Sequence, residues 1–299
     1  MRIGINGTND IQSLDRVLDR ARLAQADGFA TYWLGQIFGT DALTALAVAG
    51  REIPGIEMGT AVVPVHPRHP QMLAAQALTV QQAIGGRLAL GIGLSHQIVV
   101  ENMWGYSFED PLRYMREYLD ALVPLLNGQP VNVHGEVITA VGGLDLSADP
   151  PPLLLAALGP KMLRLAGSRG AGTITWCTGP RTLADHIVPT ITVASEEAGF
   201  GEARVVAGLP ISVTTKVDET RELATNMFAI YGGLPSYRAM LDREGVAGPA
   251  DLAIIGDEST AAAGVRQLVE AGVTDFAAVE LGVDKEDRLR TRAFLESLL

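Results

Sequence analysis

The sequence predicts an α/β fold, namely a (β/α)8 TIM barrel with insertions, formed by residues 1–299 as a single domain. Apolar segments with the length of strands alternate with amphipathic segments of helical periodicity along most of the chain. This alternation is typical of a parallel sheet covered by helices, and eight repeats favour a closed barrel. Two smaller α/β lobes are the alternative. The 299 residues are 47% hydrophobic and only 5% aromatic, which suits one large core of small side chains.

Eight segments have the apolar character expected of buried parallel strands. They are residues 2–6, 30–34, 56–63, 87–92, 152–156, 172–176, 205–214 and 275–280. The expected helices cover residues 13–27, 41–51, 71–84, 111–126, 161–169, 182–198, 218–243, 260–271 and 285–298. The first helix has the clearest signals, because Ser13 is suited to the N-cap and Gly28 to the position after the last turn.

Two segments interrupt the alternation and are predicted as insertions. Near 130–146, two short β-prone runs flank a His-Gly pair, which predicts a hairpin. Near 218–256 the pattern is helical, and a Gly-Gly-Leu-Pro run at 232–235 is expected to break the helix. No other linker or repeat indicates a second domain.

Composition restricts the partners that the chain can have. The formal net charge is −11, which matches neither nucleic acid nor an anionic membrane, because both attract clustered Lys and Arg. No run of eighteen apolar residues predicts a transmembrane helix, and the N-terminus lacks the apolar core of a signal peptide. The only cysteine, Cys177, fits a reducing cytoplasm, where we expect the protein, and is more simply a buried apolar residue than a reactive thiol. A small molecule is the expected partner.

The segment 59–70 is a first candidate site, since an apolar strand stops there at a loop containing Pro64, Pro67 and Pro70. Prolines stiffen this strand end, and barrel enzymes place ligands at the carboxyl ends of their strands. His66 is therefore a candidate for contact with substrate. His66 and His69 are three residues apart, but no Cys, Asp or Glu in the loop completes a ligand set, so no metal site is predicted.

The turn at 156–163 is a second candidate, where a strand ends in small residues and Pro160 takes the first helical position. The free N–H groups and the dipole of the following helix form an anion site, to which Lys161 can add charge. We therefore expect a phosphate site at Leu158, Gly159, Pro160 and Lys161. The alternative is an ordinary turn with a solvated lysine.

Polar side chains also follow the fourth and sixth strands. Gly93, Ser95 and His96 end the fourth strand, and His96 is a candidate acid because imidazole titrates near neutrality. The alternative is a structural or solvated histidine. Thr178, after the sixth strand, is suited either to a phosphate or ribityl chain or to capping the next helix.

Other catalytic patterns are poorly matched. The glycines at 91–93 lack the third glycine of the dinucleotide fingerprint, and neither a Gly-x-Ser-x-Gly elbow nor a Walker A motif occurs. Met103 and Trp104, after the fourth strand, either line an apolar pocket or belong to the core.

Taken together, the segments 59–70 and 90–96 resemble the luciferase-like monooxygenase superfamily. The likeness extends through 152–180 and 235–256. It is strongest toward the actinobacterial coenzyme F420-dependent oxidoreductases, and the chain is also similar to methylene-tetrahydromethanopterin reductases. The resemblance implies a flavin or deazaflavin in the mouth of a TIM barrel.

The resemblance also implies roles for individual residues. The Ala61–Val62 peptide bond is expected to be cis, so that Ala61, Val62 and Val63 support the deazaflavin ring from behind. Residues 158–161 would meet the cofactor phosphate, and Gly93, Ser95 and His96 would lie near the ring edge and the substrate.

One departure from the family pattern narrows the reaction. In the sugar-phosphate dehydrogenases of this group an Asp-His pair follows the second strand, where this chain reads Gly35-Gln36-Ile37-Phe38. Oxidation of glucose 6-phosphate is therefore not expected. A glutamate that serves as an acid elsewhere corresponds to His96. The resemblance implies hydride transfer between F420 and an unknown small organic substrate, with reduction of a C=C or C=N bond expected and His96, Gln36 or water handling the proton.

Two other functions remain open at this point. One is an FMN-dependent monooxygenase of the same fold, which would use the same phosphate site. The other is a non-catalytic ligand-binding barrel, which the missing Asp-His pair permits. The superfamily also implies a homodimer.

Overall fold

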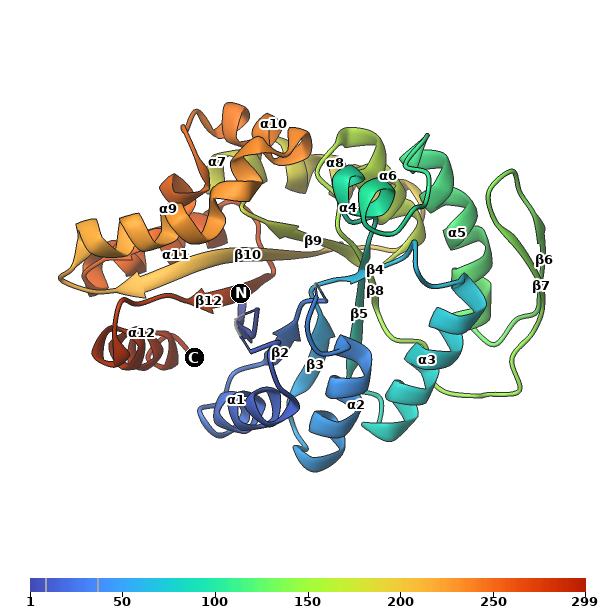
Figure 1. The fold of residues 1–299 in the computed structure, drawn as a ribbon, viewed down its shortest axis with the longest axis horizontal. Helices are drawn as coiled ribbons and strands as arrows, with labels where there is room; N and C mark the ends of the chain where they lie inside the picture. Colours follow the sequence, from blue (N-terminus) through green and yellow to red (C-terminus); the bar gives the residue numbers. More distant parts are fainter. Residues whose placement is uncertain (9, 37) are drawn as a thin grey trace.

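Eight parallel strands close into a barrel in the computed structural model, which describes residues 1–8, 10–36 and 38–299 (Figure 1). The barrel strands are β1 (Arg2–Asn6), β2 (Thr31–Leu34), β3 (Glu57–Thr60), β5 (Leu88–Gly93), β8 (Leu153–Leu155), β9 (Gly172–Trp176), β10 (Arg204–Val213) and β12 (Asp275–Glu280). The ring closes because β1 pairs with both β2 and β12, and β10 pairs with both β9 and β12. The predicted (β/α)8 TIM barrel is confirmed.

Helices surround the barrel on its outer face. They include α1 (Leu14–Ala26), α2 (Ala42–Glu52), α3 (Pro70–Ala83), α5 (Pro111–Leu126), α6 (Pro160–Arg169), α8 (Val188–Glu197), α11 (Glu258–Glu270) and α12 (Lys285–Glu296). Both signals of the first helix are confirmed, since the Ser13 side chain accepts a hydrogen bond from the Arg16 N–H and Gly28 has a φ of 87°. None of the described helices is long and apolar enough to cross a membrane.

Several short elements differ from the prediction. The segment expected as one strand at 56–63 is two, β3 and β4 (Val63–Pro64). The helix expected at 182–198 starts earlier, as α7 (Pro180–Thr182) and the π-helical turn η1 (Leu183–Ile187). Three elements were not predicted, because runs of three to six residues carry too little periodicity. They are α4 (Gln97–Asn102), η2 (Pro249–Leu252) and β11 (Ile254–Gly256).

Two segments lie outside the regular alternation. β6 (Val131–His134) and β7 (Thr139–Gly142) form an antiparallel hairpin beyond α3 and α5. The Glu117 carboxylate of α5 holds the hairpin turn by accepting hydrogen bonds from three backbone N–H groups, those of residues 136–138. The second segment contains α9 (Val217–Gly233) and α10 (Pro235–Glu244), which meet at Leu234 just before the proline.

The barrel interior is built from one large side chain and many small ones. Trp33 is completely buried inside it, together with Ala89, Leu154 and Ala277. A Cβ atom on Gly59 would collide with the Trp33 indole, so the glycine is needed for the ring to fit. This arrangement explains how a barrel can be filled by a sequence with few aromatic residues.

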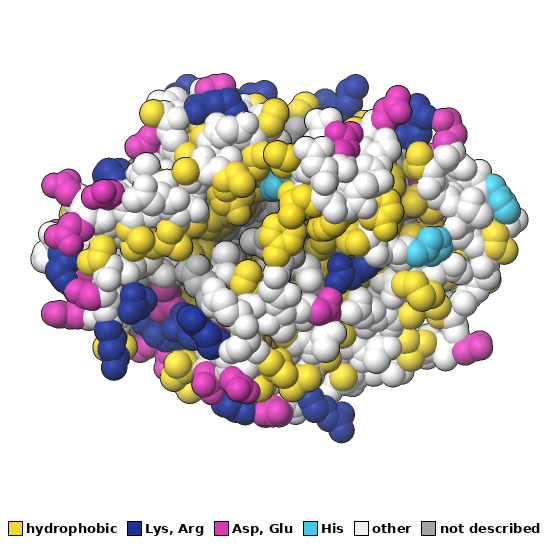
Figure 2. Space-filling model, in the orientation of Figure 1, with side chains coloured by type: hydrophobic (Ala, Val, Ile, Leu, Met, Phe, Trp, Pro, Cys, Tyr) yellow, Lys and Arg dark blue, Asp and Glu magenta, His cyan; other side chains and the backbone are white. Residues whose placement is uncertain are grey.

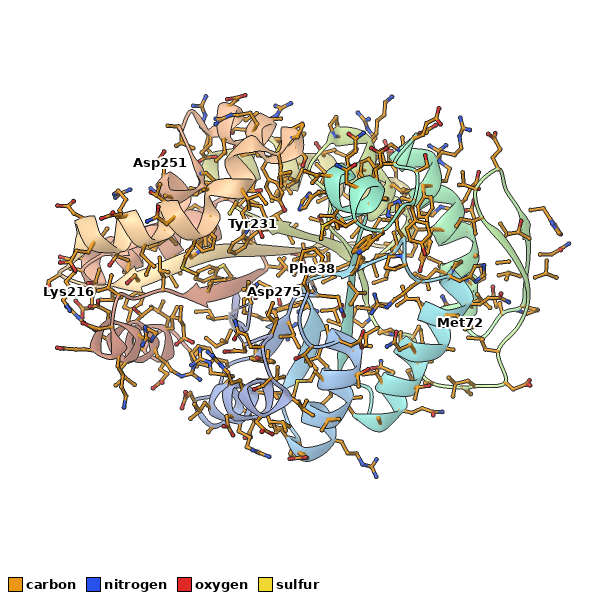
Figure 3. All side chains as sticks on the ribbon, viewed as in Figure 1. Phe38, Met72, Lys216, Tyr231, Asp251 and Asp275 are labelled. Atoms are coloured by element: carbon orange, nitrogen blue, oxygen red, sulfur yellow. The ribbon has the colours of Figure 1, made fainter. Side chains whose placement is uncertain are left out.

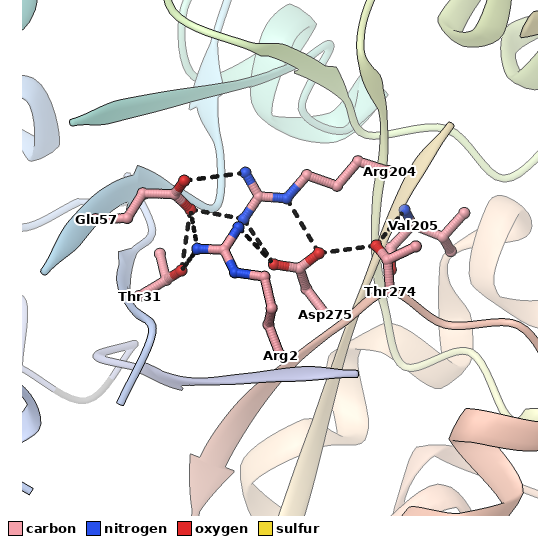
Figure 4. A network of polar contacts seen from close by, with 7 residues as sticks. All are labelled: Arg2, Thr31, Glu57, Arg204, Val205, Thr274 and Asp275. Atoms are coloured by element: carbon pink, nitrogen blue, oxygen red, sulfur yellow. Dashed lines mark hydrogen bonds and ion pairs between the residues drawn. The ribbon is translucent and has the colours of Figure 1, made fainter. Parts of the chain in front are cut away.

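An ionic network closes the amino-terminal end of the barrel (Figure 4). Arg204 bridges Glu57 and Asp275 with N···O distances of 2.6 Å to each carboxylate. Arg2 adds ion pairs to the same two carboxylates, at 3.3 and 3.4 Å. The Arg204 guanidinium lies 5.3 Å from the Trp33 ring centroid, so the network and the interior packing are continuous. The open end of the barrel is therefore the one formed by the carboxyl ends of the strands.

Candidate active site

The carboxyl ends of the strands surround a hollow lined mostly by hydrophobic side chains. Figure 2 shows this hollow near the centre of the face, with a histidine at its edge. Figure 3 places Tyr231 and Phe38 beside it, and the Phe38 side chain is 63% exposed. An apolar hollow with a few polar groups at the carboxyl ends of barrel strands is the usual place for a ligand in this fold.

The floor of the hollow is apolar at the ends of β3 and β5. The Ala61–Val62 peptide bond is cis, as the resemblance implied. Ala61 and Val62 are half-buried, whereas Val63 is buried and pairs with β5. A Cβ on Gly93 would lie 2.9 Å from Val62 Cγ2 and 3.1 Å from the Ala156 Cβ. Gly93 therefore allows these side chains to come together beneath a planar ligand.

His96 lies at the rim, on the loop after β5. Ser95 has a φ of 63°, in the left-handed region, and the chain then enters α4 with His96 as its N-cap residue. The His96 ring centroid lies 5.7 Å from that of Tyr237 and 6.5 Å from that of Tyr231. Burial lowers the pKa of His96 below its usual value of 6.5, so the imidazole is neutral at pH 7. In the neutral form one ring nitrogen donates a hydrogen bond and the other accepts one.

Four aromatic residues form one wall of the hollow and are called here the α9–α10 aromatic cluster. They are Trp176, Phe228, Tyr231 and Tyr237, with neighbouring ring centroids 5.1 to 5.9 Å apart. Burial raises the pKa of both tyrosines, so their hydroxyls stay protonated at neutral pH.

Sequence reasoning assigned no role to Tyr231 or Tyr237. Their helices are insertions relative to the barrel repeat, so no strand-end rule points to them. The one available signal was the segment 234–243, which contributed to the family resemblance without a role for its tyrosine.

The predicted phosphate turn is an open helix N-terminus. Gly159 is the N-cap of α6 and no side chain caps it, while the Gly159 carbonyl accepts the Leu163 N–H. No protein acceptor for the N–H groups of Lys161 and Met162 occurs among the described residues. Gly159 and Lys161 are exposed, and the preceding residue, Leu158, is half-buried. This end of α6 is thus available to an anion.

The next helix N-terminus is already occupied by a protein carboxylate. Glu244, from the end of α10, accepts hydrogen bonds from the N–H groups of Arg181 and Thr182 at 3.1 and 2.7 Å. Thr178 is buried there, and its hydroxyl donates to the Trp176 carbonyl at 3.3 Å. It does not cap α7, whose N-cap is Gly179, and its side chain is not exposed at the opening.

Gln36 has a structural task at the start of α2. Its amide oxygen accepts hydrogen bonds from the Ala42 N–H at 2.8 Å and from Arg68 at 3.4 Å. Only the amide nitrogen remains for a substrate. Its neighbour Ile37 lies outside the described residues.

His66, predicted to contact substrate, is almost completely buried. Its ring stacks on Tyr114, with centroids 4.3 Å apart, and is also close to Phe108 and Tyr106. The side chain is only 6% exposed, and its Nδ1 atom has no hydrogen-bond partner among the described residues. His66 thus packs in an aromatic stack beneath the rim.

The remaining candidates are dispersed. His69 is the N-cap of α3, and its ring bonds to the Gln71 N–H and the Thr139 carbonyl, so it does not form a metal pair with His66. Met103 is 59% exposed after α4, while Trp104 is half-buried. Cys177 is buried, and burial raises the pKa of its thiol. No metal-binding cluster of His, Cys, Asp or Glu is found in the described part of the chain.

Comparison with known proteins places this geometry in a family. The model of the luciferase-like monooxygenases matches residues 1–275. A 5,10-methylenetetrahydromethanopterin reductase of Methanolobus tindarius is 28% identical, over 81% of this chain and 74% of the relative.

Solved structures share the fold at low sequence identity. An F420-dependent secondary alcohol dehydrogenase, solved with an F420-acetone adduct, has a TM-score of 0.83 and 19% sequence identity. The alignment covers 100% of this chain and 98% of the dehydrogenase chain. The oxygenating constituent of the 3,6-diketocamphane monooxygenase from Pseudomonas putida, solved with FMN, has a TM-score of 0.77 and 18% identity, over 99% and 96% of the two chains.

Proposed function

Because this chain belongs to the luciferase-like monooxygenase family, we propose that it is an F420-dependent oxidoreductase acting on a small organic molecule. Its relatives include a methylenetetrahydromethanopterin reductase, and a structural neighbour is an F420-dependent dehydrogenase. The same family contains FMN enzymes, so an FMN-dependent monooxygenase is the second candidate. Because the members of this family are enzymes, the alternative of a non-catalytic ligand-binding barrel is not retained.

The observation that carries the proposal is the pairing of an open anion site with an apolar floor. Two free N–H groups and Lys161 at the start of α6 fit a cofactor phosphate. Val62, Gly93 and Ala156 form a floor that fits one face of a planar ring. The second helix N-terminus is neutralised by Glu244 and does not compete for the phosphate.

A bound deazaflavin would supply the hydride, and the protein would bind and orient the reactants. His96 and the Gln36 amide nitrogen are the proposed groups for holding a proton or water near the substrate. The α9–α10 aromatic cluster and the apolar rim would exclude water from the reacting atoms.

A fluorescence titration with F420 and, separately, with FMN tests the assignment. Tight F420 binding with weak FMN binding is expected. The reverse preference would move the protein to the FMN monooxygenases.

Lys161→Ala tests the phosphate site. Removing an exposed ammonium next to the bound phosphate should weaken F420 binding by roughly 3- to 10-fold, since one charge-assisted contact is lost. Arg164→Ala, an exposed change one turn later on α6, is the matched control. Equal affinities for wild type and Lys161→Ala would take Lys161 out of the site.

His96→Ala tests the rim histidine. Turnover should fall while the dissociation constant of F420 changes by less than about twofold, because His96 is assigned to the substrate side. A variant with normal turnover would dismiss His96 from the proton transfer.

A further inference from the structure

We propose that the hydroxyls of Tyr231 and Tyr237, together with His96, bind the oxygen atom of an uncharged carbonyl substrate. The inference rests on the proposed function, because it assigns the class of molecule that receives the hydride. It gives the helical insertion at 217–244 a direct part in substrate recognition.

The three side chains come from three elements and converge on one place. His96 follows β5, Tyr231 belongs to α9 and Tyr237 to α10. The two phenol rings meet edge to face with centroids 5.1 Å apart, and both rings lie within 6.5 Å of the imidazole. All three are half-buried, so they line the hollow and remain accessible.

These hydroxyls differ from those of the two fully buried tyrosines, Tyr32 and Tyr118, in having no protein acceptor. The half-buried Tyr114 resembles them in this respect. Tyr32 donates to Asp10 and Tyr118 donates to the Arg68 carbonyl, as buried tyrosines usually do. In the described structure no protein acceptor is found for Tyr231 or Tyr237. A half-buried donor without an acceptor costs free energy unless a ligand or water satisfies it.

The same wall contains another donor. The Nε1 atom of Trp176 is buried and makes no hydrogen bond of ordinary geometry among the described residues, although it lies close enough to the Tyr231 hydroxyl to lower the pKa of that group. Its ring centroid is 5.9 Å from that of Tyr231. The wall is therefore rich in donors and poor in acceptors, and an oxygen that only accepts hydrogen bonds is its complement.

Charge excludes a carboxylate as that oxygen. Arg238, which follows Tyr237 on α10, is engaged by Asp242 and by the carbonyls of Val246 and Ala247. His96 is neutral at pH 7, since burial lowers its pKa. An anionic substrate would lose its hydration in an aromatic pocket without gaining a counter-ion. A ketone, or an enone whose C=C bond is conjugated to the carbonyl, is the class that fits.

The tyrosines also suit the charge that develops during reduction. A bound reduced deazaflavin would supply a hydride to the carbonyl carbon, or to the β-carbon of an enone, and the carbonyl oxygen would then hold the displaced electron pair. Two phenol O–H groups that donate to that oxygen would stabilise the negative charge. One of them passes its proton to the oxygen, and the phenolate then recovers a proton from water.

The test uses two probes with the same apolar ring, 2-acetylnaphthalene and 2-naphthoate, on the F420-loaded protein. Wild type should bind the ketone at least about 10-fold more tightly than the carboxylate. Tyr231→Phe and Tyr237→Phe should each weaken ketone binding by roughly 3- to 10-fold, the value of one hydrogen bond. Tyr106→Phe, which removes an exposed hydroxyl elsewhere, should leave it unchanged.

Difference infrared spectra supply a readout that a purely structural role would not move. The carbonyl stretch of the bound ketone should lie at lower frequency in wild type than in either Phe variant, because hydrogen bonding weakens the C=O bond. Circular dichroism checks that the variants fold.

Three results would overturn the proposal. They are no ketone binding to wild type, carboxylate binding as tight as ketone binding, or Phe variants with unchanged affinity and unchanged carbonyl frequency. F420 titration of the same samples separates the two hypotheses. Failure of F420 to bind contradicts the proposed function. Ketone and carboxylate binding is then measured on the cofactor-free protein by the same titrations, and those data decide the carbonyl site.

Discussion

At the scale of single residues, unusual backbone conformations gather at the open end of the barrel. Three non-glycine residues in the described structure have positive φ, and two of them, Ser95 and Cys177, end barrel strands at the site. Left-handed conformations cost free energy for residues with a side chain, and they are often retained where a site needs them. Here they turn the chain after β5 and β9, so that His96 and Trp176 face the hollow.

His66 leads to a prediction about pH. Burial lowers the pKa of His66 below 6.5, although the backbone of Leu94 partly opposes the shift. The unfolded chain therefore binds a proton near pH 6.5 that the folded protein takes up only at lower pH. The free energy of unfolding should fall as pH drops below about 6.5.

His66→Phe keeps an aromatic ring in the stack and removes this titration. Urea unfolding between pH 7.5 and 5.5 should show a shallower loss of stability for the variant than for wild type. His134→Gln, at an exposed hairpin position, is the control and should retain the wild-type slope. Parallel curves for wild type and His66→Phe would contradict the assignment.

At the scale of elements, α10 is joined to the start of α7 by a carboxylate and by a hydroxyl hydrogen bond. Glu244 caps the N-terminus of α7, and Thr182 donates from its hydroxyl to the Met240 carbonyl of α10. A side chain on Gly179 would collide with Glu244, so the close approach depends on that glycine. These contacts position the helix that contains Tyr237.

Glu244→Ala should lower the free energy of unfolding by about 1–2 kcal/mol, because two helix N–H groups lose their acceptor and the dipole loses its counter-charge. Thermal unfolding measures the change. Glu270→Ala, an exposed carboxylate near the same surface, should shift stability by less than about 0.5 kcal/mol. An equal effect of the two substitutions would show that the capping contact contributes nothing.

At the scale of the whole molecule, the barrel has one sealed end and one open end. The sealed end joins residues far apart in the chain, since Arg204 lies 147 positions from Glu57 and 71 from Asp275. Trp33 fills the space above it. The ligand site therefore stands on a packed interior and not over a channel.

Arg204→Ala should destabilise the protein by about 3–5 kcal/mol, because Asp275 would remain buried without its main partner. Arg2→Ala should cost much less, since the Arg2 side chain is 44% exposed and contributes the longer contacts. Urea denaturation of the two variants compares them directly. A larger loss for Arg2→Ala would mean that the network is organised around Arg2.

The homodimer stays a prediction, which light scattering on the purified protein would test.

Patterns of hydrophobicity along the chain were sufficient for the barrel, because each strand and helix needs its own buried face wherever it lies. The cap at Ser13, the break before Pro235 and the open turn at 158–161 were also readable, since backbone hydrogen bonding at helix ends depends on neighbouring residues. The family resemblance supplied the cis bond at Ala61–Val62. Short elements such as β11 were missed, because their stability comes from pairing with a distant strand.

The chemistry of individual side chains depended on contacts between distant segments. Gln36 is occupied at α2, Thr178 is buried behind Trp176, and His66 lies in an aromatic stack, although all three occupy strand ends. Conversely, Tyr231 and Tyr237 reach the site from an insertion with no place in the barrel pattern. The burial and the hydrogen-bond partners of a side chain depend on which distant segments the fold brings next to it. The position of a residue at a strand end therefore does not determine its exposure or its protonation state.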